Sequence, residues 1–158
     1  EIPGSKLDLV GFYTRALAVP ARRNVGKAAP DRGARIFERI GCSSCHTPSL
    51  RTGAADAPAL ADQTIRPYSD LLLHDMGDAL GDSPSAVAMG REWRTPPLWG
   101  IGLTKTVNGH TRFLHDGRAR DMTEAVLWHG GEAAAAQKAF RGLDAHARAA
   151  VISFLNSL

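Results

Sequence analysis

Two cysteines and a histidine lie within five positions of one another, at Cys42, Cys45 and His46. A C-x-x-C-H sequence attaches a c-type haem, because the two thiols add to the haem vinyl groups and the histidine binds the iron from one side. The chain has 2 cysteines in total, so neither thiol has a disulfide partner elsewhere. The motif predicts one covalently bound haem c, with His46 as an axial ligand, and a fold built around that haem.

A C-x-x-C pair alone also occurs in thioredoxin-like redox sites and as half of many zinc sites. A zinc site would need a second pair of ligands at similar spacing, and neither C-x-x-C nor H-x-x-x-H recurs. A thioredoxin-like site would follow a strand in an alternating strand and helix pattern, which the sequence lacks. A haem-free thiol or zinc module is therefore the weakest of the alternatives.

The length of 158 residues suits one domain with a short appended segment. The formal net charge of +3 arises from 15 Arg and 4 Lys against 16 acidic residues. No dense basic stripe interleaved with aromatic residues is present, so we expect no nucleic-acid binding. A guanidinium matches the geometry of a carboxylate, so Arg94, Arg112 and Arg118 are candidates to pair with haem propionates, and a solvated surface position is the alternative for each.

No apolar run approaches the roughly 18 residues of a membrane span. The sequence from Glu1 lacks the basic start and apolar stretch of a signal peptide. Haem is attached covalently outside the bacterial cytoplasm, so we expect a periplasmic or otherwise extracytoplasmic protein whose export signal is absent from this chain.

The pattern of residues 5–18 predicts a leading helix with a capping box formed by Ser5 and Asp8. A linker follows this helix. We expect residues 1–28 to form this leading helix and linker, and residues 29–158 to form a cytochrome-c-like haem domain.

Two helices of that domain are expected to cross. One starts near Asp31 and closes at Gly41, a residue suited to the left-handed conformation after a helix. Gly33 on its inner face allows another backbone to approach closely. The last helix begins after Asp144 and carries Phe154 on its apolar face. Two amphipathic helices with other crossing partners are the alternative.

Further short helices are expected at residues 69–74, 121–128 and 132–140. Asp121 and Glu124 form a capping box for the second of these, which places His129 at its carboxyl end. The rest of the chain is rich in loops. The predicted fold class is all-α, with cytochrome-c-like helices and long loops wrapped around one covalently attached c-type haem.

Several ordered motifs carry a resemblance to a known family. They are residues 94–98 (RTPPL), 113–117 (FLHDG) and 122–126 (MTEAV), supported by residues 68–77 and 92–95. With these, the chain resembles the C-terminal haem domain of bacterial dihaem cytochrome c peroxidases, and most of all their relatives called di-haem oxidoreductases or thiol oxidoreductases. The extended segment through Arg94, Pro96 and Leu98 would then lie along the cofactor.

The resemblance implies a periplasmic protein with two cytochrome-c-like domains. Its C-terminal haem is six-coordinate and receives electrons, and the other haem meets peroxide. The present chain has one C-x-x-C-H, so the resemblance implies the electron-transfer half without its catalytic partner. Where those peroxidases place a distal methionine, this sequence has His129.

His129 is thus the first candidate for the sixth iron ligand, and Met76 is the alternative. The third possibility is an iron whose sixth position is open or filled by another residue. Lower-ranked candidates for that ligand are Met89, His74, His110 and His115. Two imidazole ligands would give a low-spin haem of lower potential than a His/Met pair, with no vacant site for peroxide.

The leading functional hypothesis is a monohaem c-type cytochrome domain that passes single electrons, either to a second haem domain or to a redox partner protein. The runner-up is a haem enzyme, a peroxidase or thiol oxidoreductase, that works at an open or displaceable distal site. We expect the first more than a self-sufficient peroxidase, because no distal acid or base is evident in the sequence.

Overall fold

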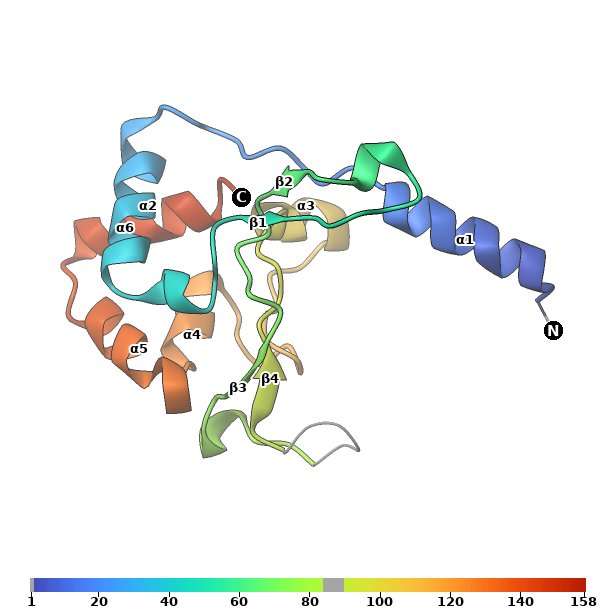
Figure 1. The fold of residues 1–158 in the computed structure, drawn as a ribbon. Helices are drawn as coiled ribbons and strands as arrows, with labels where there is room; N and C mark the ends of the chain where they lie inside the picture. The colour runs from blue at the N-terminus through green and yellow to red at the C-terminus, as the bar shows by residue number, and fades with distance from the viewer. Residues whose placement is uncertain (1, 84–89) are drawn as a thin grey trace.

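The computed structural model describes residues 2–83 and 90–158 and is mainly helical (Figure 1). The α-helices are α1 (Gly4–Ala16), α2 (Ala28–Arg39), α3 (Thr104–Asn108), α4 (Met122–Leu127), α5 (Ala134–Arg141) and α6 (Ala145–Leu155). Single 3-10 turns are η1 (Cys42–Ser44), η2 (Pro58–Leu60), η3 (Asp78–Leu80), η4 (Ile101–Leu103) and η5 (Gly131–Ala133). Long loops join these elements, as the sequence predicted.

Two small antiparallel sheets mean that the fold is not purely α. Strand β1 (Leu50–Arg51) pairs with β2 (Thr64–Ile65), and β3 (Leu73–Asp75) pairs with β4 (Glu92–Arg94). The second pair has Leu73 opposite Arg94 and Asp75 opposite Glu92. The strict all-α prediction is therefore wrong in detail, although helices dominate the described residues.

The core forms where α2 crosses α6. Gly33 of α2 lies so close to α6 that a Cβ there would stand 1.9 Å from the carbonyl oxygen of Ala150 and 2.8 Å from Cβ of Phe154. This confirms the predicted crossing and the reason for a glycine at position 33. The buried apolar residues include Ile36, Phe37, Leu98, Met122, Phe140, Ala147, Ala150, Val151, Phe154, Leu155 and Leu158.

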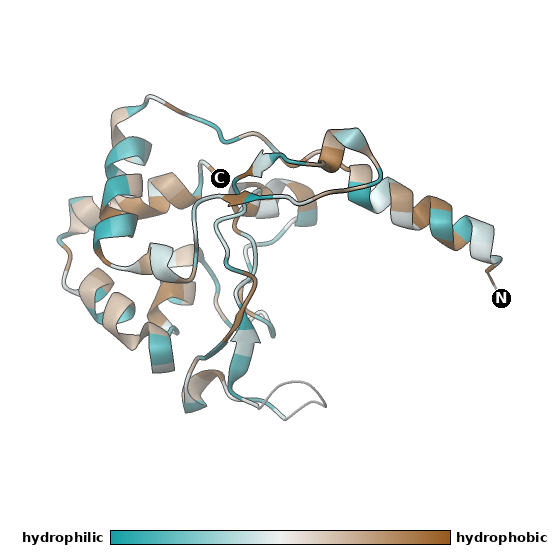
Figure 2. Cartoon of the chain, in the orientation of Figure 1, coloured by the Kyte–Doolittle hydropathy of each residue, from teal (hydrophilic) through white to brown (hydrophobic). Residues whose placement is uncertain are grey.

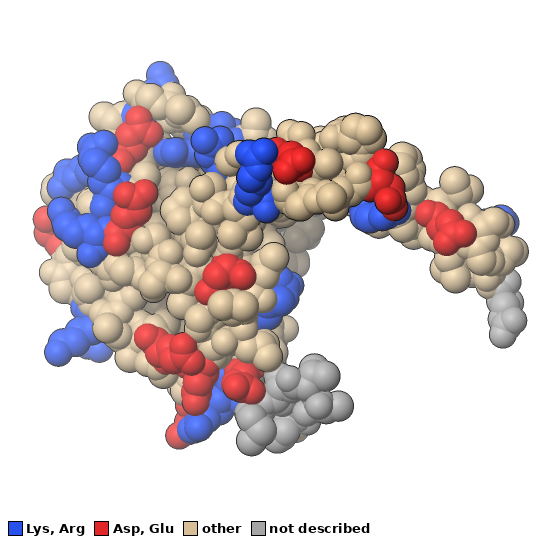
Figure 3. All heavy atoms as spheres, in the orientation of Figure 1, with Lys and Arg blue, Asp and Glu red and all other residues tan. Residues whose placement is uncertain are grey.

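The outer face of α2 is charged, and its opposite face is apolar and turned toward the core. Arg32, Arg35 and Arg39 are exposed there together with Glu38, and Figure 3 shows basic side chains gathered over this helix with acidic ones between them. Figure 2 shows the matching contrast, with hydrophilic stretches on the visible side of α2 and a hydrophobic stretch of α6 where it passes behind. Water solvates the charges, and burial of the apolar stripe stabilises the crossing.

The predicted ends of three helices are confirmed. Asp144 accepts a hydrogen bond from the Ala147 amide at 2.7 Å, and Asp121 accepts one from the Glu124 amide at 2.8 Å. Each carboxylate thereby satisfies a backbone donor that the first helical turn leaves without a partner. Gly41, after α2, takes the left-handed conformation with φ of 90°.

The expected short helix over residues 69–74 is wrong, because this stretch leads into strand β3. Ser69 Oγ accepts a hydrogen bond from the Leu71 amide at 2.9 Å, and Asp70 Oδ1 accepts one from the Leu72 amide at 3.0 Å. Side chains that bind the backbone two residues on compete with the helical pattern. Leu71 also has φ of 63°, a left-handed value that no α-helix contains.

Helix α1 extends away from the rest of the molecule (Figure 1) and has no buried residue. It begins at Gly4, so Ser5 lies inside the first turn, and no side chain caps it; the expected Ser5 and Asp8 capping box is wrong. Within the part of the chain that the structure describes, no helix combines the length and apolar character needed to cross a bilayer.

Residues after α1 bind the carboxyl end of α6. The Arg23 amide donates to the Ser157 carbonyl at 2.7 Å, and its guanidinium donates to the Asn156 carbonyl at 2.7 Å. Arg22 pairs with Asp31 at 3.1 Å and lies 5.1 Å from the centroid of the Phe154 ring. This part of the expected linker is therefore packed against α2 and the end of α6.

Deleting residues 1–17 should leave the unfolding temperature within about 2 °C of the full chain, because α1 buries no side chain. Thermal unfolding followed by circular dichroism measures this, with Arg23→Ala as a contrasting variant that removes hydrogen bonds to the end of α6 and should lower the transition. A loss of many degrees on deletion would mean that α1 supports the core.

Candidate functional site

His46 is held in place by the turn that contains the two cysteines. After Gly41 the chain forms η1, and the His46 amide donates to the Cys42 carbonyl at 3.0 Å. The His46 ring places Nδ1 2.9 Å from the carbonyl oxygen of Tyr68. A carbonyl only accepts, so Nδ1 carries the proton and Nε2 keeps its lone pair.

His129 is held in the same way at the end of α4. Its amide donates to the Val126 carbonyl at 3.2 Å, and its Nδ1 lies 2.8 Å from the carbonyl oxygen of Ala125. Nε2 is again the nitrogen with a free lone pair. The described residues contain no hydrogen bond to Nε2 of either histidine.

The centroids of the two imidazole rings lie 6.5 Å apart, and the ring planes are tilted by 46° relative to each other. An imidazole nitrogen binds a metal at roughly 2 Å, and each ring adds about 1 Å from that nitrogen to its centroid, so two trans imidazoles on one metal lie roughly 6 Å apart by centroid. The observed separation fits a single iron between His46 and His129. The structure therefore brings together the two residues that the sequence put forward as axial ligands.

Both imidazoles are neutral at physiological pH. Burial lowers the pKa of His46 to about 4, although the hydrogen bond to Tyr68 opposes this shift, and burial also lowers the pKa of His129. A metal binds the deprotonated nitrogen, so neutral rings with protonated Nδ1 atoms are prepared to bind through Nε2 without losing a proton first.

Cys42 and Cys45 are not joined to each other by a disulfide. Burial raises the pKa of Cys42 to about 11, and it raises the pKa of Cys45 as well. A thioredoxin-like nucleophile needs the opposite shift, toward a stable thiolate. The electrostatics of the motif thus disfavour the thiol-exchange alternative.

Aromatic side chains surround His46 on the core side. Its ring centroid lies 6.1 Å from that of Phe37, and Phe37 lies 5.2 Å from Phe154 in an edge-on arrangement. The Tyr68 ring contacts Phe154 at 5.5 Å. The α2 and α6 crossing thereby forms the apolar wall behind the candidate proximal ligand.

The extended segment that begins at the end of β4 is partly exposed and partly buried. Leu98 is buried in the core and its amide donates to the Pro67 carbonyl at 2.8 Å, whereas Arg94 and Pro96 are exposed. For the alternative ligand Met76, the described contacts are those of its backbone, which bonds Arg91 and lies against Gly130. Met89 lies outside the described residues.

Of the arginines considered for propionates, Arg118 already has a carboxylate partner. It pairs with Asp116 and a backbone carbonyl, and its guanidinium lies 5.1 Å from the Trp128 ring centroid. Arg112 is exposed. His115 stacks on Trp93 with centroids 3.7 Å apart, and Asp116 bonds Arg118, which fits the structural turn that the sequence suggested.

A charged group beside the motif was missed by the sequence analysis. His74 binds Asp70 through Nε2 and Glu132 through Nδ1, both at 2.8 Å. Cys45, Asp70 and His74 also have ligand atoms within 4.8 Å of one another. Both ring nitrogens of His74 are engaged by carboxylates, so this group is an ion-pair network rather than a metal site. Residues 74 and 132 lie too far apart in sequence for any local pattern to reveal the pair.

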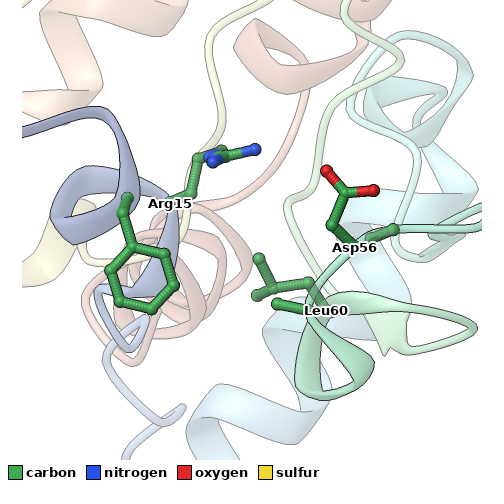
Figure 4. A pocket seen from close by; sticks show the side chains of 6 residues that line it. Arg15, Asp56 and Leu60 are labelled. Carbon is green, nitrogen blue, oxygen red and sulfur yellow. The ribbon is translucent and has the colours of Figure 1, made fainter. Parts of the chain in front are cut away.

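A surface pocket lies between α1 and η2. Figure 1 shows α1 away from α2 and α6. Phe12, Arg15, Asp56 and Leu60 contribute to its lining, and Figure 4 shows the Arg15 and Asp56 side chains on opposite sides of it. It contains none of the residues discussed above, so it plays no part in the candidate site.

A family model for di-haem oxidoreductases matches residues 5–158. The chain belongs to the di-haem oxidoreductase family. This confirms the family resemblance, and it makes haem binding and redox chemistry the expected properties of the fold. The paired imidazoles His46 and His129 fit such a cofactor by their separation, protonation and burial.

Among solved structures, this di-haem oxidoreductase family member is similar to a chain of hydrazine synthase from Kuenenia stuttgartiensis. The TM-score is 0.60 and the sequence identity is 20%, over 100% of this chain and 56% of that chain. The likeness concerns the fold alone, and the present chain spans little more than half of the solved one. None of the curated proteins compared with the chain matches it.

Proposed function

We propose that this chain is a c-type cytochrome domain that relays single electrons outside the cytoplasm. One haem would be attached through Cys42 and Cys45 and bound axially by His46 and His129. Such a haem supplies a one-electron couple at its iron. The observation that carries the proposal is the pair of partly buried, neutral imidazoles whose ring centroids lie 6.5 Å apart.

The residues around the pair support relay rather than turnover of a substrate. As an iron ligand, His129 would occupy the coordination position that a substrate needs, and the Ala125 carbonyl of its own helix fixes its ring. The buried Phe37 ring lies 6.1 Å from the His46 ring and would shield that side of the iron from water. Electrons would pass to a redox partner protein or a second haem domain, and the periplasm is the proposed compartment.

The proposed covalent attachment through Cys42 and Cys45 can be tested directly. Protein produced in a host that matures c-type cytochromes should keep its chromophore on the polypeptide after denaturation, because thioether bonds survive unfolding. The Cys42→Ala, Cys45→Ala double variant should release it. Loss of the chromophore from the denatured wild-type chain would overturn covalent attachment.

The native protein should show a six-coordinate low-spin spectrum that equimolar peroxide leaves unchanged over minutes. The family description also names peroxidase activity. A high-spin component that reacts rapidly with peroxide would instead support a peroxidase. Absorption spectroscopy with stopped-flow mixing makes both observations.

A further inference from the structure

The segment that follows Tyr68 contacts both sides of the candidate haem site. On the proximal side, the Tyr68 carbonyl binds His46, the Ser69 amide donates to the Thr47 carbonyl at 3.0 Å, and the Asp70 amide donates to the Cys45 carbonyl at 2.8 Å. These bonds tie the start of the segment to the C-x-x-C-H turn.

The same segment, six residues further on, lies against the turn that follows His129. A Cβ on Gly131 would stand 2.1 Å from the Asp75 carbonyl oxygen, and one on Gly130 would stand 2.8 Å from that of Met76. The Asp75 amide donates to Glu132 Oε1 at 3.0 Å. Glycines at positions 130 and 131 allow this close approach of two backbones.

His74 joins the two regions through its side chain. Nε2 lies 2.8 Å from Asp70 Oδ2 on the proximal side, and Nδ1 lies 2.8 Å from Glu132 Oε2 on the distal side. The His74 side chain is 16% exposed and that of Asp70 is 14% exposed, so water screens the Asp70 bond only in part, whereas Glu132 is 56% exposed. Two acidic acceptors engage both ring nitrogens, which requires the doubly protonated imidazolium.

We propose that His74 is a positioning residue: by bridging Asp70 and Glu132, it holds the segment that orients His46 against the turn that carries His129, and so keeps both rings on the iron. The inference rests on the proposed axial pair. The sequence put His74 forward as a lower-ranked candidate for the sixth ligand. In this proposal His74 does not bind the iron and instead positions the residues that do. Loosening the bridge should let the His129 turn move away and the distal bond open more often.

Cyanide is a suitable probe, because it can bind the oxidised iron only when His129 has left it. In Glu132→Gln and His74→Gln, the rate of cyanide binding should rise by about 10- to 100-fold, the usual cost of losing a residue that supports a metal ligand. The electron paramagnetic resonance signals of the low-spin haem, which depend on the angle between the imidazole planes, should shift or broaden in the same variants.

His146→Gln is the matched control, since His146 is an exposed histidine of α6. Glu132→Gln should leave the chain folded, because that side chain is more than half exposed, so it tests the bridge even if His74→Gln unfolds. The double variant should be no faster than the faster single variant, because both changes break one bridge.

Cyanide rates within twofold of the wild type in Glu132→Gln, with the low-spin signals unchanged, would overturn the bridge while leaving the proposed axial pair intact. A wild-type protein that is high-spin or lacks covalent haem would instead remove the proposed function itself. The two failures are therefore distinguishable in one set of samples.

Discussion

Replacing His129 by alanine should convert the oxidised protein from a low-spin to a predominantly high-spin spectrum. The change removes the imidazole whose centroid lies 6.5 Å from that of His46 and leaves no side chain at position 129 long enough to reach the iron. Cyanide binding should accelerate by more than the roughly 10- to 100-fold expected for losing a supporting residue. Absorption spectra before and after cyanide addition measure both effects.

Added imidazole should restore the low-spin spectrum of His129→Ala, because it can occupy the space of the missing ring. His146→Ala removes an exposed histidine from α6 and should leave the spectrum as it is. A low-spin His129→Ala protein would contradict the proposed ligand and would direct attention to Met76.

Gly33→Ala should destabilise the fold strongly, although alanine is the better helix former by about 1 kcal/mol. The added methyl would lie 1.9 Å from the Ala150 carbonyl oxygen and 2.5 Å from its carbon, which are backbone atoms of α6. No rotation of a side chain relieves that overlap, so the helices must separate. Overpacking of this kind costs about 1–3 kcal/mol or more, and we expect the unfolding temperature to fall by roughly 5 °C or more.

Gly11→Ala is the matched control for that variant. Gly11 also lies within a helix, α1, but a Cβ there would meet no atom within 4 Å. Its unfolding temperature should stay at or slightly above that of the wild type in the same circular dichroism experiment. Equal transitions for both variants would show that the α2 and α6 contact yields more easily than its geometry indicates.

Features with a local physical signature could be predicted from the sequence. Asp121 and Asp144 cap their helices because a carboxylate before a helix accepts amide hydrogen bonds wherever the rest of the chain lies. Gly33 signalled a close approach because only glycine has no side chain to displace. The motif at Cys42 and the helix end at His129 pointed to the two imidazoles whose centroids the structure places 6.5 Å apart.

Features that depend on distant partners, on main-chain groups that every residue has, or on competing local bonds could not be predicted. The bond between His74 and Glu132 spans 58 positions, and no spacing rule connects them. The carbonyls that orient His46 and His129 belong to Tyr68 and Ala125, and every residue has a carbonyl, so residue type gives no signal for them. The stretch after Tyr68 failed as a helix because side-chain bonds within it outweighed its apolar pattern.

The hydrogen bonds from both rings to main-chain carbonyls would affect the speed of the proposed electron exchange. A ligand held by a side chain can swing with that side chain when the iron changes charge, whereas Tyr68 and Ala125 carbonyls move only with their backbone. With both imidazoles fixed in this way, gaining or losing an electron would require little rearrangement of the iron's surroundings. A small reorganisation energy is the property that would let such a domain exchange electrons rapidly in either direction.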